Sequence, residues 1–161
     1  MLTKLKTAYK KLLESKEFKN EGILSGAFLM CDMENLDKTE WQLDFYNKES
    51  DRITTYNIGH KIELTDNSEV FKDENMKIEE LDLEEIKVNF EDIKEKLKEI
   101  LEKRHEDAIK ITIILQKQTF PIWNIIYITK KFNLLNIKIN AINSDVIEEK
   151  AIPLLSFEKT K

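Results

Sequence analysis

Two stretches of this chain decide the fold that its sequence predicts: Trp41-Gln-Leu-Asp-Phe-Tyr46 and Trp123-Asn-Ile-Ile-Tyr-Ile128. Each begins with a tryptophan, continues as an alternating apolar strand pattern, and ends in a short polar turn followed by a second alternating stretch. An amphipathic helical pattern precedes each of them. Segments that resemble one another at a regular spacing indicate an internal repeat. The sequence therefore predicts one helix-plus-sheet unit that occurs twice.

The two predicted helices have matching apolar faces. The first carries Leu5, Tyr9, Leu12 and Leu13, and the second carries Ile93, Leu97, Ile100 and Leu101. Apolar side chains at this spacing indicate a helix that packs on a core through one stripe. Asn89 or a neighbour is predicted to cap the second helix, because asparagine side chains accept hydrogen bonds from free amide groups at helix starts.

The strand predictions complete each unit. Strands are expected at 23–32, 40–47, 52–58 and 61–64, and again at 109–117, 122–129, 134–141 and 146–149. We predict an α+β pseudo-repeat of two tandem helix-plus-antiparallel-sheet units, forming one compact body or two closely joined halves. The first unit covers 1–64 and the second covers 89–161. Between them, 65–88 is an acidic connector whose apolar residues, among them Val70 and Phe71, predict that it packs on the body.

The second tryptophan strand is apolar at every position from Ile122 to Ile128 except Asn124. Strands with apolar side chains on both faces are usually covered on both faces. The helix of the same unit covers one face. We expect the first unit or the connector to cover the other, and a homodimer is the alternative.

Three pieces of the second unit carry a family resemblance: Trp123-Asn-Ile-Ile-Tyr127, Leu135-Asn-Ile-Lys-Ile139, and the turn Asn140-Ala-Ile-Asn-Ser-Asp-Val146. Together they resemble the PepSY pattern of peptidase propeptides and related modules, in which an Asp-Ala-x-Thr-Gly-Glu-Val turn ends the third strand. Ser144 stands in place of the glycine of that pattern. The first unit resembles a more divergent copy, and the whole chain is similar to archaeal proteins of PepSY-like type.

The resemblance implies a PepSY/cystatin-like fold in each unit. It also implies a module that binds or restrains peptidases, or that acts in sensing and interaction. No catalytic residues come with the family. The abundance of lysine over arginine, together with many isoleucines and asparagines, indicates an AT-rich genome and fits an archaeal source.

Composition favours a cytoplasmic protein. Cys31 is the single cysteine, which excludes a disulfide framework and a thiolate metal cluster. No stretch approaches the roughly 18 consecutive apolar residues of a membrane span, so no membrane association is expected.

No residue pattern indicates catalysis, a metal or a cofactor. His60 and His105 have no metal-ligating neighbour at a suitable spacing, so both are interpreted as surface residues. Cys31 ends an apolar run and is interpreted as an inert thiol. An enzyme would need Asp44 and Asp51 to converge with His60. We therefore predict a protein that is not an enzyme and binds no cofactor.

The leading hypothesis is a non-enzymatic interaction module for a protein or peptide partner, with a peptidase as one candidate. Candidate partner-binding residues on the second sheet are Phe120, Ile122, Ile126, Lys130 and Lys131. They would act through an apolar patch or through an added strand at a sheet edge.

The two tryptophans are interpreted as structural anchors, because they recur at equivalent positions. The alternative function is a small-ligand-binding protein with a pocket between helix and sheet beside Trp41 or Trp123. Nucleic acid is not expected as a partner, because arginine is nearly absent and the net charge is −5.

Overall fold

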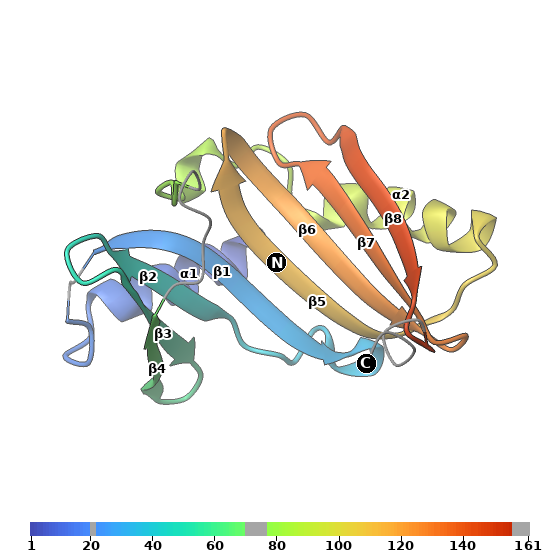
Figure 1. Ribbon diagram of the computed structural model, residues 1–161. Helices are drawn as coiled ribbons and strands as arrows, with labels where there is room; N and C mark the ends of the chain where they lie inside the picture. Colours follow the sequence, from blue (N-terminus) through green and yellow to red (C-terminus); the bar gives the residue numbers. More distant parts are fainter. Residues whose placement is uncertain (20–21, 70–76, 156–161) are drawn as a thin grey trace.

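The strands of the computed structural model form one eight-stranded antiparallel sheet, in the order β4-β3-β2-β1-β5-β6-β7-β8 (Figure 1). The structure describes residues 1–19, 22–69 and 77–155. One half of the sheet contains β1 (Ile23–Asp32), β2 (Gln42–Asn47), β3 (Arg52–Ile58) and β4 (Ile62–Glu69). The other contains β5 (Ala108–Gln118), β6 (Phe120–Thr129), β7 (Asn133–Asn140) and β8 (Val146–Pro153).

Both α-helices pack on the same side of this sheet, behind it in the view of Figure 1. They are α1 (Leu2–Leu13) and α2 (Phe90–Lys103). Tyr9 of α1 stacks on Phe45 of β2, with ring centroids 6.4 Å apart, and Phe90 of α2 meets Trp123 of β6 at 6.1 Å. Two short 3-10 helices, η1 (Met33–Asn35) and η2 (Leu83–Glu85), lie in the connections. The core therefore fills the space between the helices and one face of the sheet.

The prediction of two tandem helix-plus-sheet units is wrong, because the strands do not form two sheets. β1 pairs with β5 along Gly26–Asp32, which runs antiparallel to Lys110–Gln116. Two separate four-stranded sheets would leave the outer edges of β1 and β5 unpaired, and exposed backbone edges are a liability that proteins avoid. Pairing these edges satisfies the backbone groups of both strands and gives one continuous sheet.

The connecting segment between β4 and α2 packs against the core where it is described. Leu81, Leu83 and Ile86 are buried, and the Leu81 amide donates to the Leu24 carbonyl at 2.7 Å. β4 continues to Glu69, past the predicted end of the first unit at residue 64. Val70 and Phe71, which were expected to help anchor this segment, lie outside the described residues.

Asn89 caps α2 and also joins the two helices. Its side-chain oxygen accepts from the Phe90 amide at 2.9 Å and from the Leu2 amide of α1 at 3.1 Å. The Asn89 amide donates in turn to the Asp92 carboxylate at 2.8 Å, which completes a capping box.

Asn89→Ala should lower the free energy of unfolding by about 1–2 kcal/mol, because it removes a helix cap and a contact between helices. Chemical denaturation followed by circular dichroism measures this loss. Asn35→Ala is the control, since that side chain is exposed and makes no hydrogen bond within the described ranges. The control should stay within about 0.5 kcal/mol of the parent. Equal stability of both variants would contradict the role given to Asn89.

Candidate functional site

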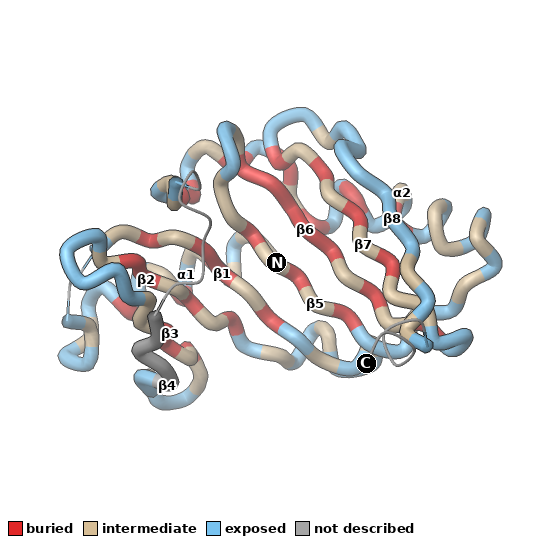
Figure 2. Tube along the Cα trace, in the orientation of Figure 1, coloured by how far each residue is buried: buried red, intermediate tan, exposed pale blue. Residues whose placement is uncertain are grey.

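The face of the sheet that points away from α1 and α2 is the candidate site, and we call it the open face. Residues directly opposite one another on antiparallel strands point to the same side of a sheet. One row of such residues crosses β1, β5, β6 and β7 and consists of Phe28, Ile114, Asn124 and Lys138. The neighbouring row, Ala27, Leu115 and Trp123, is buried against the helices. Figure 2 shows this alternation of buried and partly buried positions along the central strands.

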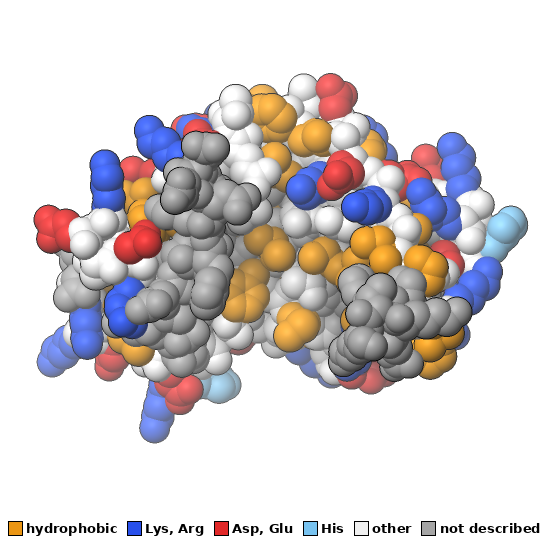
Figure 3. All heavy atoms as spheres, viewed as in Figure 1, with side chains coloured by type: hydrophobic (Ala, Val, Ile, Leu, Met, Phe, Trp, Pro, Cys, Tyr) orange, Lys and Arg blue, Asp and Glu red, His pale blue; other side chains and the backbone are white. Residues whose placement is uncertain are grey.

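Apolar side chains gather on the open face over β1, β5 and β6 (Figure 3). By strand register, the face carries Phe28, Met30, Ile114, Ile126, Ile128, Leu134 and Ile152. Met30 is 67% exposed. No helix covers this face in residues 1–19, 22–69 and 77–155. Charged pairs border it, with Asp32 opposite Lys110 and with Lys138 3.5 Å from Glu148.

Two asparagines interrupt the apolar surface. Asn124 on β6 and Asn136 on β7 both belong to the open face, and each side-chain oxygen is buried without a hydrogen-bond partner. Asn124 is only 8% exposed. A buried polar atom left unpaired costs about 1–3 kcal/mol, and such atoms are rare in folded proteins. These two acceptors would be satisfied by a hydrogen-bond donor placed on the open face.

The predicted partner-binding residues occupy one strand and its following turn. Phe120, Ile122 and Ile126 are on the open face of β6, but Ile122 is only 5% exposed and offers little contact surface. Lys130 and Lys131 are exposed in the turn after β6. About ten residues of extended strand, roughly 33 Å, separate Phe120 from Lys130. The structure therefore places three of the five on one face and the two lysines at its far end.

Sequence reasoning missed the contribution of β1. Phe28 and Met30 lie beside Ile114 and Thr112 on the open face. The alternation in Ala27-Phe-Leu-Met-Cys31 marks them as members of one strand face, but only the pairing of β1 with β5 brings that face next to the second half of the sheet. Asn124 was visible in the sequence as the one exception to the apolar stretch from Ile122 to Ile128.

Both tryptophans lie in the core. Trp41 and Trp123 are 0% exposed, and their ring centroids are 6.5 Å apart. The Trp123 indole N–H donates to the Val88 carbonyl at 2.8 Å, whereas the Trp41 indole nitrogen is buried without a partner. Because neither ring has accessible surface, the expected ligand pocket beside the tryptophans is not formed.

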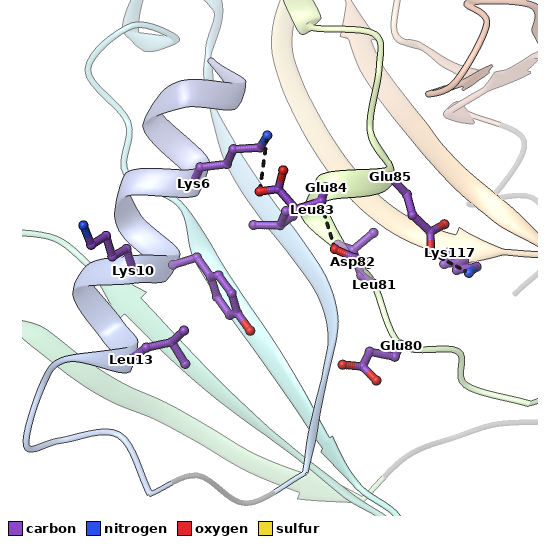
Figure 4. A pocket seen from close by; sticks show the side chains of 11 residues that line it. Lys6, Lys10, Leu13, Glu80, Leu81, Asp82, Leu83, Glu84, Glu85 and Lys117 are labelled. Carbon is purple, nitrogen blue, oxygen red and sulfur yellow. Dashed lines mark hydrogen bonds and ion pairs between the residues drawn. The ribbon is translucent and has the colours of Figure 1, made fainter.

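The clearest hollow on the helix side lies between α1 and residues 80–85 (Figure 4). It has a volume of about 720 Å³ and carries charges of both signs. Lys6 pairs with Glu84 at 3.7 Å and Lys117 pairs with Glu85 at 3.2 Å. Burial, followed by the charges of Glu80 and Asp82, raises the pKa of Tyr9. The remaining charged lining residues, Lys10, Glu80 and Asp82, are of both signs, so this hollow has no strong preference for a ligand of either sign.

Asp44, Asp51 and His60, which make up one possible catalytic group in the sequence, do not converge. Asp51 precedes β3 and His60 follows it, so the seven residues of that strand, roughly 23 Å, separate them. The Asp44 carboxylate accepts from the Thr55 hydroxyl at 2.6 Å, and Asp51 accepts from the Tyr46 hydroxyl. Within the described ranges no three His, Cys, Asp or Glu side chains come close enough to hold a metal ion.

Tyr127 on β6 is a buried phenol on the helix side of the sheet. It is 3% exposed, and burial raises its pKa to about 12. Its hydroxyl makes no hydrogen bond to any residue in the described part of the chain. Tyr127 is therefore protonated at neutral pH and keeps a free hydrogen-bond donor.

Trp123→Phe should cost about 1–3 kcal/mol more stability than Trp41→Phe, because only the first change leaves a buried carbonyl, that of Val88, without its donor. The two variants are matched in the size of the ring fragment removed. Thermal or urea unfolding of both variants measures the difference. Equal losses would contradict the assigned hydrogen bond.

Tyr127→Phe should remove part of the loss in folding stability that the parent protein shows at alkaline pH. The folded pKa lies above the unfolded value of 10, so the unfolded chain loses the proton first. The contribution of Tyr127 to the free energy of unfolding is complete below pH 10, and it falls by ~2–3 kcal/mol as the pH rises to about 12. Urea unfolding across this range measures the stability difference between parent and variant. A difference that stays constant with pH would contradict the buried, neutral phenol.

Comparison with known proteins gives a fold but no family. No family model matches the chain, and no curated protein sequence matches it. The structure is similar to the crystal structure of a putative lipoprotein from Clostridium difficile 630, with a TM-score of 0.54 and 14% identity over 93% of this chain and 91% of that one. No helix of the described residues is long and apolar enough to cross a membrane. The PepSY resemblance, the archaeal source and the cytoplasmic location stay predictions.

Proposed function

We propose that the protein is a non-enzymatic interaction module that binds a protein partner through the open face of its sheet. The observation that carries the proposal is Asn124, whose side-chain oxygen is buried and unpaired beside the apolar side chains of Ile114 and Ile126. If the Asn124 side chain turns outward on binding, an N–H or O–H donor of the partner reaches this oxygen and removes the cost of the unpaired acceptor. Asn136 offers a second acceptor on the next strand.

The surrounding surface suits such a partner. Phe28, Ile114 and Ile126 supply apolar contact area on one side of the acceptors. On the other side, Lys138 lies opposite Asn124 and Lys150 lies opposite Asn136. Four strands spaced about 4.8 Å apart, over seven residues each, span roughly 450 Å². Apolar side chains cover part of this area, and exposed apolar patches of a few hundred Å² are frequently functional on monomeric proteins. A standard interface covers about 800 Å² per partner, so the partner should be a peptide or should extend onto the charged border.

Substitution on the open face tests the proposal. Met30→Asp and Ile126→Asp place a charge on the apolar surface, and Leu13→Asp is the matched control on α1, where Leu13 is 46% exposed. Each immobilised protein is incubated with lysate of the source organism, and bound proteins are quantified by mass spectrometry. Partners held by the parent and by the Leu13 variant should be lost from the two open-face variants. The proposal is contradicted if the open-face variants capture the same proteins as the parent, or if the parent captures none.

Asn124→Leu gives a second and sharper test. Replacing an unpaired buried amide with an apolar side chain of similar size should stabilise the free protein by about 1 kcal/mol. The same change should weaken partner capture, because the acceptor is gone. A purely structural asparagine would give a loss of stability, with partner capture unchanged in the fraction that remains folded.

A further inference from the structure

A second cleft on the helix side of the sheet lies between α2 and the segment that follows β1. Its volume is about 390 Å³, within the range of roughly 300–1,000 Å³ that is typical of small-molecule sites. Met33 and Leu36 form one wall and α2 forms the other. The complete lining is Met33, Leu36, Phe90, Lys94, Glu95, Leu97, Lys98, Leu101, Ile111 and Tyr127.

The cleft is apolar except at two places. The first is Tyr127, which comes from the sheet and contributes the only hydroxyl among the lining residues. Because its ring is buried and its hydroxyl lacks a partner in the described residues, the hydroxyl is available to donate to a ligand. Its raised pKa keeps it protonated over the physiological range.

The second polar place is the α2 wall. Lys94 and Lys98 are four residues apart and therefore lie on one side of the helix. The Lys94 ammonium lies 5.9 Å from the centroid of the Phe90 ring, at the edge of the apolar lining. Neither lysine makes an ion pair in the described part of the chain, although Lys94 interacts electrostatically with Glu91 on the same helix. Two lysines against Glu95 give the lining a net charge of +1. The cleft thus has an excess of positive charge.

We propose that this cleft binds a small anionic amphiphile, a medium-chain monocarboxylate in its simplest form. The apolar tail lies against Leu97, Leu101 and Ile111. The carboxylate accepts a hydrogen bond from Tyr127 and is attracted by Lys94 and Lys98. A neutral or cationic amphiphile would lose the charge attraction and, when cationic, would meet two like charges. The site is on the opposite side of the sheet from the open face, so it does not depend on the proposed function.

Decanoate is the probe, and isothermal titration calorimetry of the full chain is the measurement. Saturable binding of one decanoate per chain is expected, with decyltrimethylammonium binding at least about tenfold more weakly. Tyr127→Phe should weaken decanoate binding about tenfold or more, because a hydrogen bond to a charged group is lost. Lys98→Glu should weaken it several-fold. Leu36→Trp fills the cleft from a half-buried position and should abolish binding.

Two controls make the result specific. Lys10→Glu reverses a charge on α1, away from the cleft, and should leave decanoate affinity unchanged. Met30→Asp disables the open face and should also leave it unchanged, which separates this inference from the proposed function. The inference is overturned if decanoate does not saturate by about 1 mM. It is equally overturned if the folded Tyr127→Phe and Leu36→Trp variants bind decanoate as the parent does.

Discussion

The pairing of β1 with β5 is the interaction on which the rest of the structure depends. Seven consecutive register pairs, from Gly26 with Gln116 to Asp32 with Lys110, join the two halves of the sheet. We call this β1–β5 pairing the seam. On the helix side it brings Leu29 beside Ile113, and both side chains are almost fully buried. Trp41 and Trp123 then meet across the centre of the same core. The backbone seam and the tryptophan contact therefore support each other.

Both candidate surfaces follow from this seam. On one side it places the apolar residues of β1 next to those of β5 and β6, which turns two narrow strand faces into one open face. On the other side, the chain leaves β1 at Asp32 and continues through η1 beside α2, so that Met33 and Leu36 close the cleft over Tyr127. A protein with two separate sheets would have neither surface in this form.

The sequence predicted the local elements well because periodicity and turn residues are local signals. The strands at 23–32 and 52–58 have the predicted bounds, and Asn89 caps α2. What it could not predict was the pairing of strands about 80 residues apart, since nothing in β1 specifies β5 as its neighbour. The repeat pattern instead favoured two tandem units, each with its own sheet. The cleft beside α2 was missed for the same reason, because Leu36 and Tyr127 come together only through that long-range pairing.

Native-state hydrogen exchange across the seam tests the central claim most directly. If one sheet is formed, the backbone amides that bond β1 to β5 should be among the most protected in the protein. They should exchange only through global unfolding, together with amides of β2 and β6. Rapid exchange of the amides in Gly26–Asp32 and Lys110–Gln116 would contradict the claim. So would different free energies of opening for the amides of β2–β3 and those of β6–β7. Either result would mean two independent sheets.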